Sequence, residues 1–188
     1  MKIPSFLRPV VAPGEVARER HLQTFRAEIA AAAGGGDRAA LEALRGRPAQ
    51  LGLGEEEAAL ECEHVAGLLA AADLRERLAR GEPPEVIRTR HPAVAGEACY
   101  FIAPASFPDG LMDQGGKLFL TNNRVLYLGS SARGAAWTQV KEVRDFERDI
   151  ILTVQPLDLL RFRCNSYVDT LRAIELARHL SSAAKAAR

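Results

Sequence analysis

The fold is decided by a stretch in the second half of the chain, which reads Gly116-Lys117-Leu118-Phe119-Leu120-Thr121-Asn122-Asn123-Arg124-Val125-Leu126-Tyr127. Two runs of mostly apolar residues, 117–121 and 124–128, flank a pair of asparagines. This pattern is typical of two antiparallel strands joined by a two-residue turn, and asparagine tolerates the positive φ that such a turn demands. We therefore predict a β-hairpin.

Both faces of this hairpin are apolar. With Asn122-Asn123 as the turn, Phe119 lies opposite Leu126 and Leu118 lies opposite Tyr127. A sheet that is open to water on one side alternates apolar and polar residues, and this one does not. One face fills the domain core, so we expect the other to be covered by residues 16–80 or by another protein chain. The candidate partner-binding surface comprises Phe107, Leu111, Met112, Phe119, Leu126 and Leu128.

The alternation with period two continues on both sides of the hairpin. Further strands are predicted at 98–103, 135–138, 140–146, 150–154 and 160–164. Ser166 and Asp169 then make a capping-box-like start for a helix that keeps helical spacing up to Leu180. A small antiparallel barrel or bent sheet, capped by a C-terminal helix, follows from this order.

The first half of the chain has helical periodicity. Leu22, Phe25 and Ile29 share one face of a first helix, which Gly34-Gly35-Gly36 ends. Asp37 is placed to cap a short second helix. Arg47-Pro48 is expected to break that helix, with Leu51 and Leu53 packing from the following loop. A third helix is expected from about Gly54 to Arg80, with Leu60 and Leu68 on its apolar stripe.

The change from helical spacing in the first half to alternation of period two in the second predicts two modules. Residues 1–90 form a helical module with a proline-rich linker at its end, and residues 91–188 form the strand-rich domain. Pro83, Pro84 and Pro92 hold the linker extended. The predicted class is α+β. We expect a fragment 91–188 to fold alone.

Two motifs in the strand-rich domain resemble those of GRAM and bacterial pleckstrin-homology-like (PH-like) domains. One is Gly96-Glu97-Ala98-Cys99-Tyr100-Phe101, and the other is the hairpin above with its Thr-Asn-x-Arg sequence. Trp137, Val140 and Val143 match the strand pair that follows. The resemblance covers residues 94–182 and implies the PH fold, which hosts lipid, peptide and protein binding alike. Residues 1–90 resemble no family known to us.

Composition excludes several protein classes. The chain has 188 residues, 47% of them hydrophobic and 26% charged, which excludes wholesale disorder and a disulfide-framework mini-protein. The formal net charge is +1, so the broad basic field of a non-specific nucleic-acid binder is missing. The N-terminal stretch lacks the pattern of a secretion signal, and no apolar run has the ~20 residues of a bilayer span. We expect a cytoplasmic location. Cys62, Cys99 and Cys164 are expected to be reduced and mostly buried.

Three features of the sequence bear on whether the chain holds a chemical site. Glu61-x-x-His64 has the spacing of helix-borne metal ligands, but a di-iron site needs a second copy, which the chain lacks. No Ser or Cys stands in a nucleophile motif with a histidine, so we expect no catalysis and no cofactor. Arg161-Phe162-Arg163 alternates basic and aromatic residues as nucleic-acid binders do, but it equally fits a strand with Phe162 in the core.

The loop 106–116 bears on lipid binding. It carries Asp109 and Asp113 and no basic residue before Lys117, and two carboxylates repel an anionic headgroup. We predict no specific phosphoinositide binding there.

The predicted function is a non-catalytic scaffold or adaptor that acts through protein–protein association, self-association included. Peripheral membrane or lipid binding is the first alternative. An enzyme whose residues assemble only in three dimensions is the second.

Overall fold

The computed structural model describes residues 13–108, 115–156 and 158–187. The chain divides into two compact units, one up to Val65 and one from Ala66 onward, with the boundary inside helix α4 (Ala59–Ala79). This boundary describes compactness, whereas the division predicted near residue 90 states that residues 91–188 fold without the rest of the chain. That statement stays a prediction.

The N-terminal unit is helical, as expected. It contains α1 (Pro13–Gly35), α2 (Arg38–Ala43), the 3-10 turn η1 (Leu44–Gly46) and α3 (Arg47–Gln50). Phe25 and Ile29 are buried. Gly36 takes a positive φ of 64° just after α1 ends, and the Asp37 side chain accepts a hydrogen bond from the Ala39 amide at 2.9 Å. The predicted stop and cap are thus confirmed.

Three details of the helical prediction were wrong. Arg47-Pro48 does not lead into a loop but starts α3, because the fixed φ of proline suits the first turn of a helix. Helix α4 begins at Ala59 rather than Gly54, and the Glu57 carboxylate instead accepts a hydrogen bond from the Gly54 amide at 2.7 Å. Leu60, placed on the apolar stripe, is 43% exposed.

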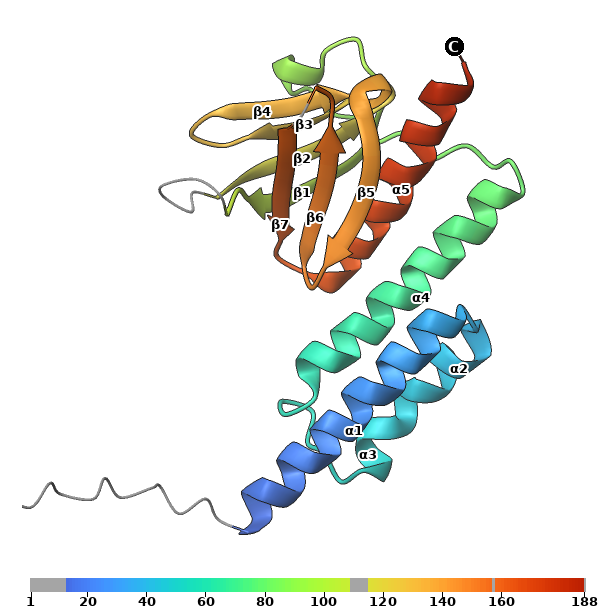
Figure 1. The fold of residues 1–188 in the computed structure, drawn as a ribbon, viewed down its shortest axis with the longest axis vertical. Coiled ribbons are helices and arrows are strands. Elements are labelled where there is room, and N and C mark those ends of the chain that lie inside the picture. Colours follow the sequence, from blue (N-terminus) through green and yellow to red (C-terminus); the bar gives the residue numbers. More distant parts are fainter. Residues whose placement is uncertain (1–12, 109–114, 157, 188) are drawn as a thin grey trace, which may run out of the picture. The chain divides into compact units, whose positions relative to one another are not determined.

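The C-terminal unit holds one antiparallel sheet of seven strands (Figure 1). Its strands are β1 (Cys99–Ser106), β2 (Gly115–Thr121), β3 (Arg124–Leu128), β4 (Ala132–Ala136), β5 (Val140–Phe146), β6 (Asp149–Val154) and β7 (Asp158–Cys164). They lie in the order β4-β3-β2-β1-β7-β6-β5, and β4 and β5 end the sheet, so it is open. The helix α5 (Tyr167–Ala186) follows. This confirms the α+β class and the PH-like order of strands and final helix.

The hairpin has the predicted register but a different turn. Phe119 pairs with Leu126 and Leu118 with Tyr127. Neither asparagine takes a positive φ, since Glu147 is the one non-glycine residue with positive φ in the described part of the chain. The Thr121 hydroxyl stabilises the turn instead, by accepting hydrogen bonds from the amides of Asn123 and Arg124.

The core lies between the inner face of the sheet and α5. Leu118, Leu152 and Phe162 are fully buried in it, and Ile174 of α5 is 1% exposed. Ser166 caps α5 as expected, because its hydroxyl accepts a hydrogen bond from the Asp169 amide at 3.0 Å. The strand predicted at 135–138 is shifted. It ends at Ala136, and Trp137–Gln139 form the 3-10 turn η3.

The second face of the hairpin is covered by the segment just before β1. The 3-10 turn η2 (Pro92–Val94) places Val94 over Phe119 and Leu126, and the His91 ring lies 5.1 Å from the Phe119 ring. The expectation that residues 16–80 or another chain cover this face is therefore corrected. Proline-rich composition indicated a spacer, whereas the packing of Val94 and His91 on the hairpin makes the segment part of the core.

Within the C-terminal unit, the second half of α4 packs closely on the start of α5. A Cβ atom on Gly67 would lie 2.9 Å from the backbone carbonyl of Tyr167 and 3.0 Å from a methyl group of Leu171. Arg75 also binds Glu175 through two hydrogen bonds of 3.0 and 2.6 Å. Only glycine permits this approach of the two backbones.

Gly67→Ala is therefore expected to destabilise the protein by about 1–2 kcal/mol, as overpacking outweighs the higher helix propensity of alanine. Gly34→Ala is the matched control, because Gly34 is also helical and has nothing within 4 Å of its added Cβ. Urea unfolding of both variants measures the difference. Equal stability of the two variants would contradict the close packing.

Candidate functional site

The candidate site is the outer face of β5, β6 and β7. Ile150, Leu152 and Val154 of β6 point into the core, so the alternate residues of β6 point outward. The strand register then defines three outward rows, which are Phe146–Asp149–Arg163, Arg144–Ile151–Arg161 and Glu142–Thr153–Leu159. We call these nine residues the β5–β7 outer face.

This face exposes two large apolar side chains at its opposite ends. Phe146 is 57% exposed and Leu159 is 55% exposed, with the half-buried Ile151 and Thr153 between them. Single exposed apolar residues are normal on a surface. Here the two apolar side chains lie on either side of Arg144, Arg161 and Arg163. Aromatic residues and arginine are enriched where proteins bind each other.

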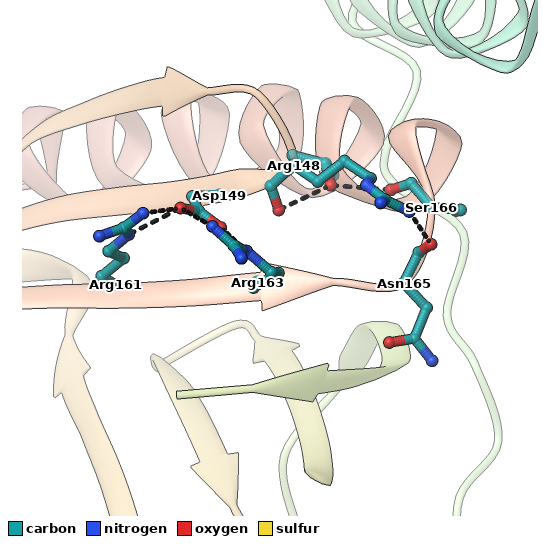
Figure 2. A network of polar contacts seen from close by, with 7 residues as sticks. Arg148, Asp149, Arg161, Arg163, Asn165 and Ser166 are labelled. Carbon is teal, nitrogen blue, oxygen red and sulfur yellow. Dashed lines mark hydrogen bonds and ion pairs between the residues drawn. The ribbon is translucent and has the colours of Figure 1, made fainter. Parts of the chain in front are cut away.

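Asp149 is buried although it belongs to this outer face. Its carboxylate has no exposed surface, and it lies between Arg161 and Arg163 of β7 (Figure 2). The Nε atoms of both arginines donate to it at 2.6 Å, and both Nη2 groups also bond to Oδ2. The two arginine side chains keep 29% and 43% exposure, so they form the lid over the carboxylate.

The charge state of Asp149 follows from this arrangement. Burial alone would raise the pKa of the carboxyl group, but the hydrogen bonds from Arg163 and Arg161, together with their positive charges, outweigh it. The pKa of Asp149 is therefore lowered. The carboxylate is ionised at neutral pH and holds both guanidinium groups in place.

The turn between β5 and β6 is tied to the start of α5. Glu147 takes a positive φ of 54°, and Arg148 donates from Nη1 to the Asn165 carbonyl at 2.8 Å. The Arg148 guanidinium lies 5.8 Å from the centre of the Tyr167 ring. The backbone carbonyl of Arg148 accepts a hydrogen bond from the Thr170 hydroxyl. These contacts join the turn to the segment that leads into α5, and Figure 2 shows Arg148 beside Asn165 and Ser166.

The structure does not expose the predicted partner surface as one face. Phe119 is 1% and Leu126 7% exposed, and with the half-buried Leu128 they lie in the cluster beneath Val94. Phe107 packs on the other side, with its ring 6.1 Å from Tyr127 and 5.9 Å from Phe162. Leu111 and Met112 lie outside the described residues, as does most of the loop between β1 and β2.

The motifs behind the family resemblance have a structural role. The Glu97 carboxylate accepts from the Thr121 hydroxyl at 2.6 Å and pairs with Arg124 at 2.7 Å. Arg124 also donates to the Ala93 carbonyl at 2.8 Å, and the Asn122 side chain accepts from the Ala98 amide at 3.0 Å. This cluster fastens the segment before β1 to the hairpin.

The metal hypothesis gains no support. The Glu61 side chain is buried and accepts a hydrogen bond from Arg26 at 2.7 Å, a structural contact within the N-terminal unit. Across residues 13–108, 115–156 and 158–187, no three or more His, Cys, Asp or Glu side chains gather as metal ligands would.

The cysteines depart from expectation at one position. Cys99 and Cys164 are buried, and burial raises the pKa of the Cys164 thiol to about 12. Cys62, however, is exposed. It follows the buried Glu61 directly in α4.

Sequence reasoning found only part of this face. Phe162 lies in the core and its flanking arginines on the outer side, as the strand interpretation of Arg161-Phe162-Arg163 predicts. Asp149 and Phe146 were missed. The available signal was an acidic residue at the first outward position of a strand otherwise made of Ile, Leu, Thr and Val.

No helix in the described part of the chain has the length and apolar character needed to cross a membrane.

Comparisons with known proteins show distant structural likenesses only. No protein-family model and no curated protein matches the chain. The C-terminal domain of an unknown protein from Leishmania infantum matches at 17% identity with a TM-score of 0.39, over 47% of this chain and 89% of that one.

Two guanine-nucleotide-exchange-factor structures are also similar. The truncated linker-DH/PH domains of p115-RhoGEF match at 8% identity with a TM-score of 0.43, over 86% of this chain and 55% of that one. The DH/PH domains of PDZ-RhoGEF, in complex with activated RhoA, match at 11% identity with a TM-score of 0.41, over 77% and 52%. The chain thus spans about half the length of these DH/PH structures, and likenesses at this level identify no shared function.

Proposed function

We propose that the chain is a non-catalytic binding module that acts through protein–protein association, with the β5–β7 outer face as its contact surface. The observation that carries the proposal is the exposure of Phe146 and Leu159 around a set of fixed arginines. The proposal includes a cytoplasmic location, an adaptor role and kinship with GRAM or bacterial PH-like modules. The Glu97–Thr121–Arg124 cluster supports that kinship, because it occupies the positions of the resembling motifs.

The composition of the face suits binding. A rigid sheet presents side chains whose backbone needs no ordering on association, which lowers the entropic cost of binding. Phe146 and Leu159 offer large apolar contacts, and the arginines between them add hydrogen-bond donors. A few residues, aromatic ones prominent among them, carry most of the binding energy of a protein interface, at about 2 kcal/mol or more each.

The test compares two double variants of the full chain. Phe146→Ser with Leu159→Ser removes both exposed apolar side chains of the face, and Val16→Ser with Val86→Ser removes two apolar side chains elsewhere that are about half exposed. We call the Phe146→Ser, Leu159→Ser chain the face variant. Both it and the wild type are used to capture proteins from a lysate of the source cells, and the proteins that only the wild type captures are purified. Their dissociation constants for all three chains are then measured.

The face variant is expected to bind at least about tenfold more weakly, while the control binds as the wild type does. Sedimentation velocity of the chain alone reveals whether the partner is a second copy. Equal affinities of the three chains would contradict the proposed surface. Vesicle binding that the face variant loses would favour the membrane alternative.

A further inference from the structure

Strand β5 has a free edge. It lies at one end of the sheet and, in the described part of the chain, pairs with β6 alone. Only two residues separate Phe146 from Asp149, and so short a turn closes with a hydrogen-bonded pair. Hydrogen-bonded and non-hydrogen-bonded pairs alternate along an antiparallel ladder, so Val143 and Asp145 direct their backbone amides and carbonyls away from β6. Such an edge is a template for a further strand.

The side chains along this edge reach solvent. Five of the seven residues of β5 are exposed. Lys185 of α5 donates to the Lys141 carbonyl at 3.1 Å, and Arg178 pairs with Asp145 at 3.1 Å, with 44% and 51% of the two side chains exposed. Exposed contacts of charged side chains contribute little to stability, so they do not close the edge.

The charges of β5 are complementary to those of a second copy. The strand reads Lys141-Glu142-Val143-Arg144-Asp145. When two copies pair antiparallel with Val143 at the centre, Glu142 lies opposite Arg144 of the second copy. Lys141 then lies opposite Asp145 of the second copy. Both pairs join opposite charges, and the twofold symmetry of the arrangement repeats each of them.

The neighbouring registers place like charges opposite each other. A shift by one residue brings Lys141 opposite Arg144 of the second copy in one direction, and Glu142 opposite Asp145 in the other. A shift by two residues brings Glu142 opposite its own counterpart, or Arg144 opposite its own counterpart. Like charges directly opposite each other destabilise a sheet, so the sequence of β5 favours the register centred on Val143.

This pairing requires no unused donor. Within one chain the Arg144 Nε atom already donates to the Glu142 carboxylate at 2.7 Å. In the paired sheet these two residues and their counterparts form a square, in which each neighbour along a strand or across the strands has the opposite charge. Each charge therefore gains a second opposite neighbour and keeps its first.

We propose that two copies of the chain associate through the free edge of β5, which joins their sheets into one antiparallel sheet with the twofold axis at Val143. The backbone groups of Val143 and Asp145 pair across the axis, and the charges of the strand fix the register. The inference goes beyond the proposed function, because it uses the edge of the strand and leaves the exposed side chains of Phe146 and Leu159 to a different partner.

Charge exchange between two chains tests the proposal. Sedimentation equilibrium over rising protein concentration measures dimerisation of the wild type, of Glu142→Arg and of Arg144→Glu. Each variant places like charges opposite each other in its own dimer, so we expect it to dimerise at least about tenfold more weakly. An equal mixture of the two variants should regain dimerisation, because the two arginines of one chain then lie opposite the two glutamates of the other.

Two further variants serve as controls. Glu142→Arg with Arg144→Glu in one chain exchanges the two charges, so it should dimerise as the wild type does. Glu42→Arg removes an exposed pair with Arg45 in the N-terminal unit and should leave dimerisation unchanged. Amide hydrogen exchange of residues 141–145 should slow as the dimer forms, because the outward amides become paired.

A wild type that stays monomeric at every concentration overturns the inference and leaves the proposed function standing. A dimer that Glu142→Arg does not weaken, or a mixture that does not regain dimerisation, also overturns it. The face variant keeps the edge of β5 and should still dimerise. Loss of its dimer would overturn the inference in favour of self-association through the β5–β7 outer face.

Discussion

Trp137→Ala is expected to lower the free energy of unfolding by about 3–5 kcal/mol, as for other large buried aromatic residues. Trp137 is 1% exposed and belongs to the main core cluster. Its indole Nε1 also donates to the Thr121 carbonyl at 2.7 Å. The substitution leaves a cavity at the end of β4 and a carbonyl without its donor. Urea unfolding followed by circular dichroism measures the loss, because the substitution removes the one tryptophan whose fluorescence could otherwise report unfolding.

Trp137→Phe separates the two contributions. Phenylalanine keeps most of the apolar volume but cannot donate to Thr121, so a smaller loss of about 1–3 kcal/mol is expected. A loss below about 1 kcal/mol for Trp137→Ala would contradict the core position. Such a result would indicate that the indole is available for binding instead.

Asp149→Ala is expected to cost about 2–4 kcal/mol. Breaking a fully buried ion pair by removing one partner costs about 3–5 kcal/mol, and the partial exposure of both arginines reduces that figure. Glu142→Ala is the matched control, because Glu142 pairs with Arg144 on the same face but both side chains are exposed. The control should lose less than about 1 kcal/mol.

The contribution of Asp149 should depend on pH in one direction. Its pKa in the folded state lies below its value in the unfolded chain, which is about 3.9. The stabilisation is therefore complete above pH ~4 and is lost as the pH falls through the folded-state pKa. The stability difference between the wild type and Asp149→Asn should be constant from pH 5 to 7 and shrink below pH 4. A difference that grows on acidification would contradict the assignment.

Local chemistry made much of the fold predictable. The Asn122-Asn123 turn, the pairing of Phe119 with Leu126, and the caps at Asp37 and Ser166 each depend on residues only a few positions apart. Interactions between residues so close in the chain can be predicted from the local sequence alone. The turn itself shows the limit, because the Thr121 hydroxyl provides a stabilisation that needs no positive φ.

The candidate site was less predictable, because its parts come from different strands. The outward position of Arg161 and Arg163 follows from the alternation around Phe162. That they bind one buried carboxylate depends on the register of β6 against β7, which pairs Asp149 with Arg163. A shift by one residue would have turned Asp149 to the other face of the sheet.

The sequence by itself determined the period of each segment, the helix caps, the hairpin register and the order of strands before a final helix, since these depend on local geometry. Only the tertiary structure decided which surfaces remain exposed. The apolar second face of the hairpin is filled by Val94 and His91 from the proline-rich segment, whereas Phe146 and Leu159 stay in contact with solvent. Burial depends on what packs against a residue, and that partner can come from any distance along the chain.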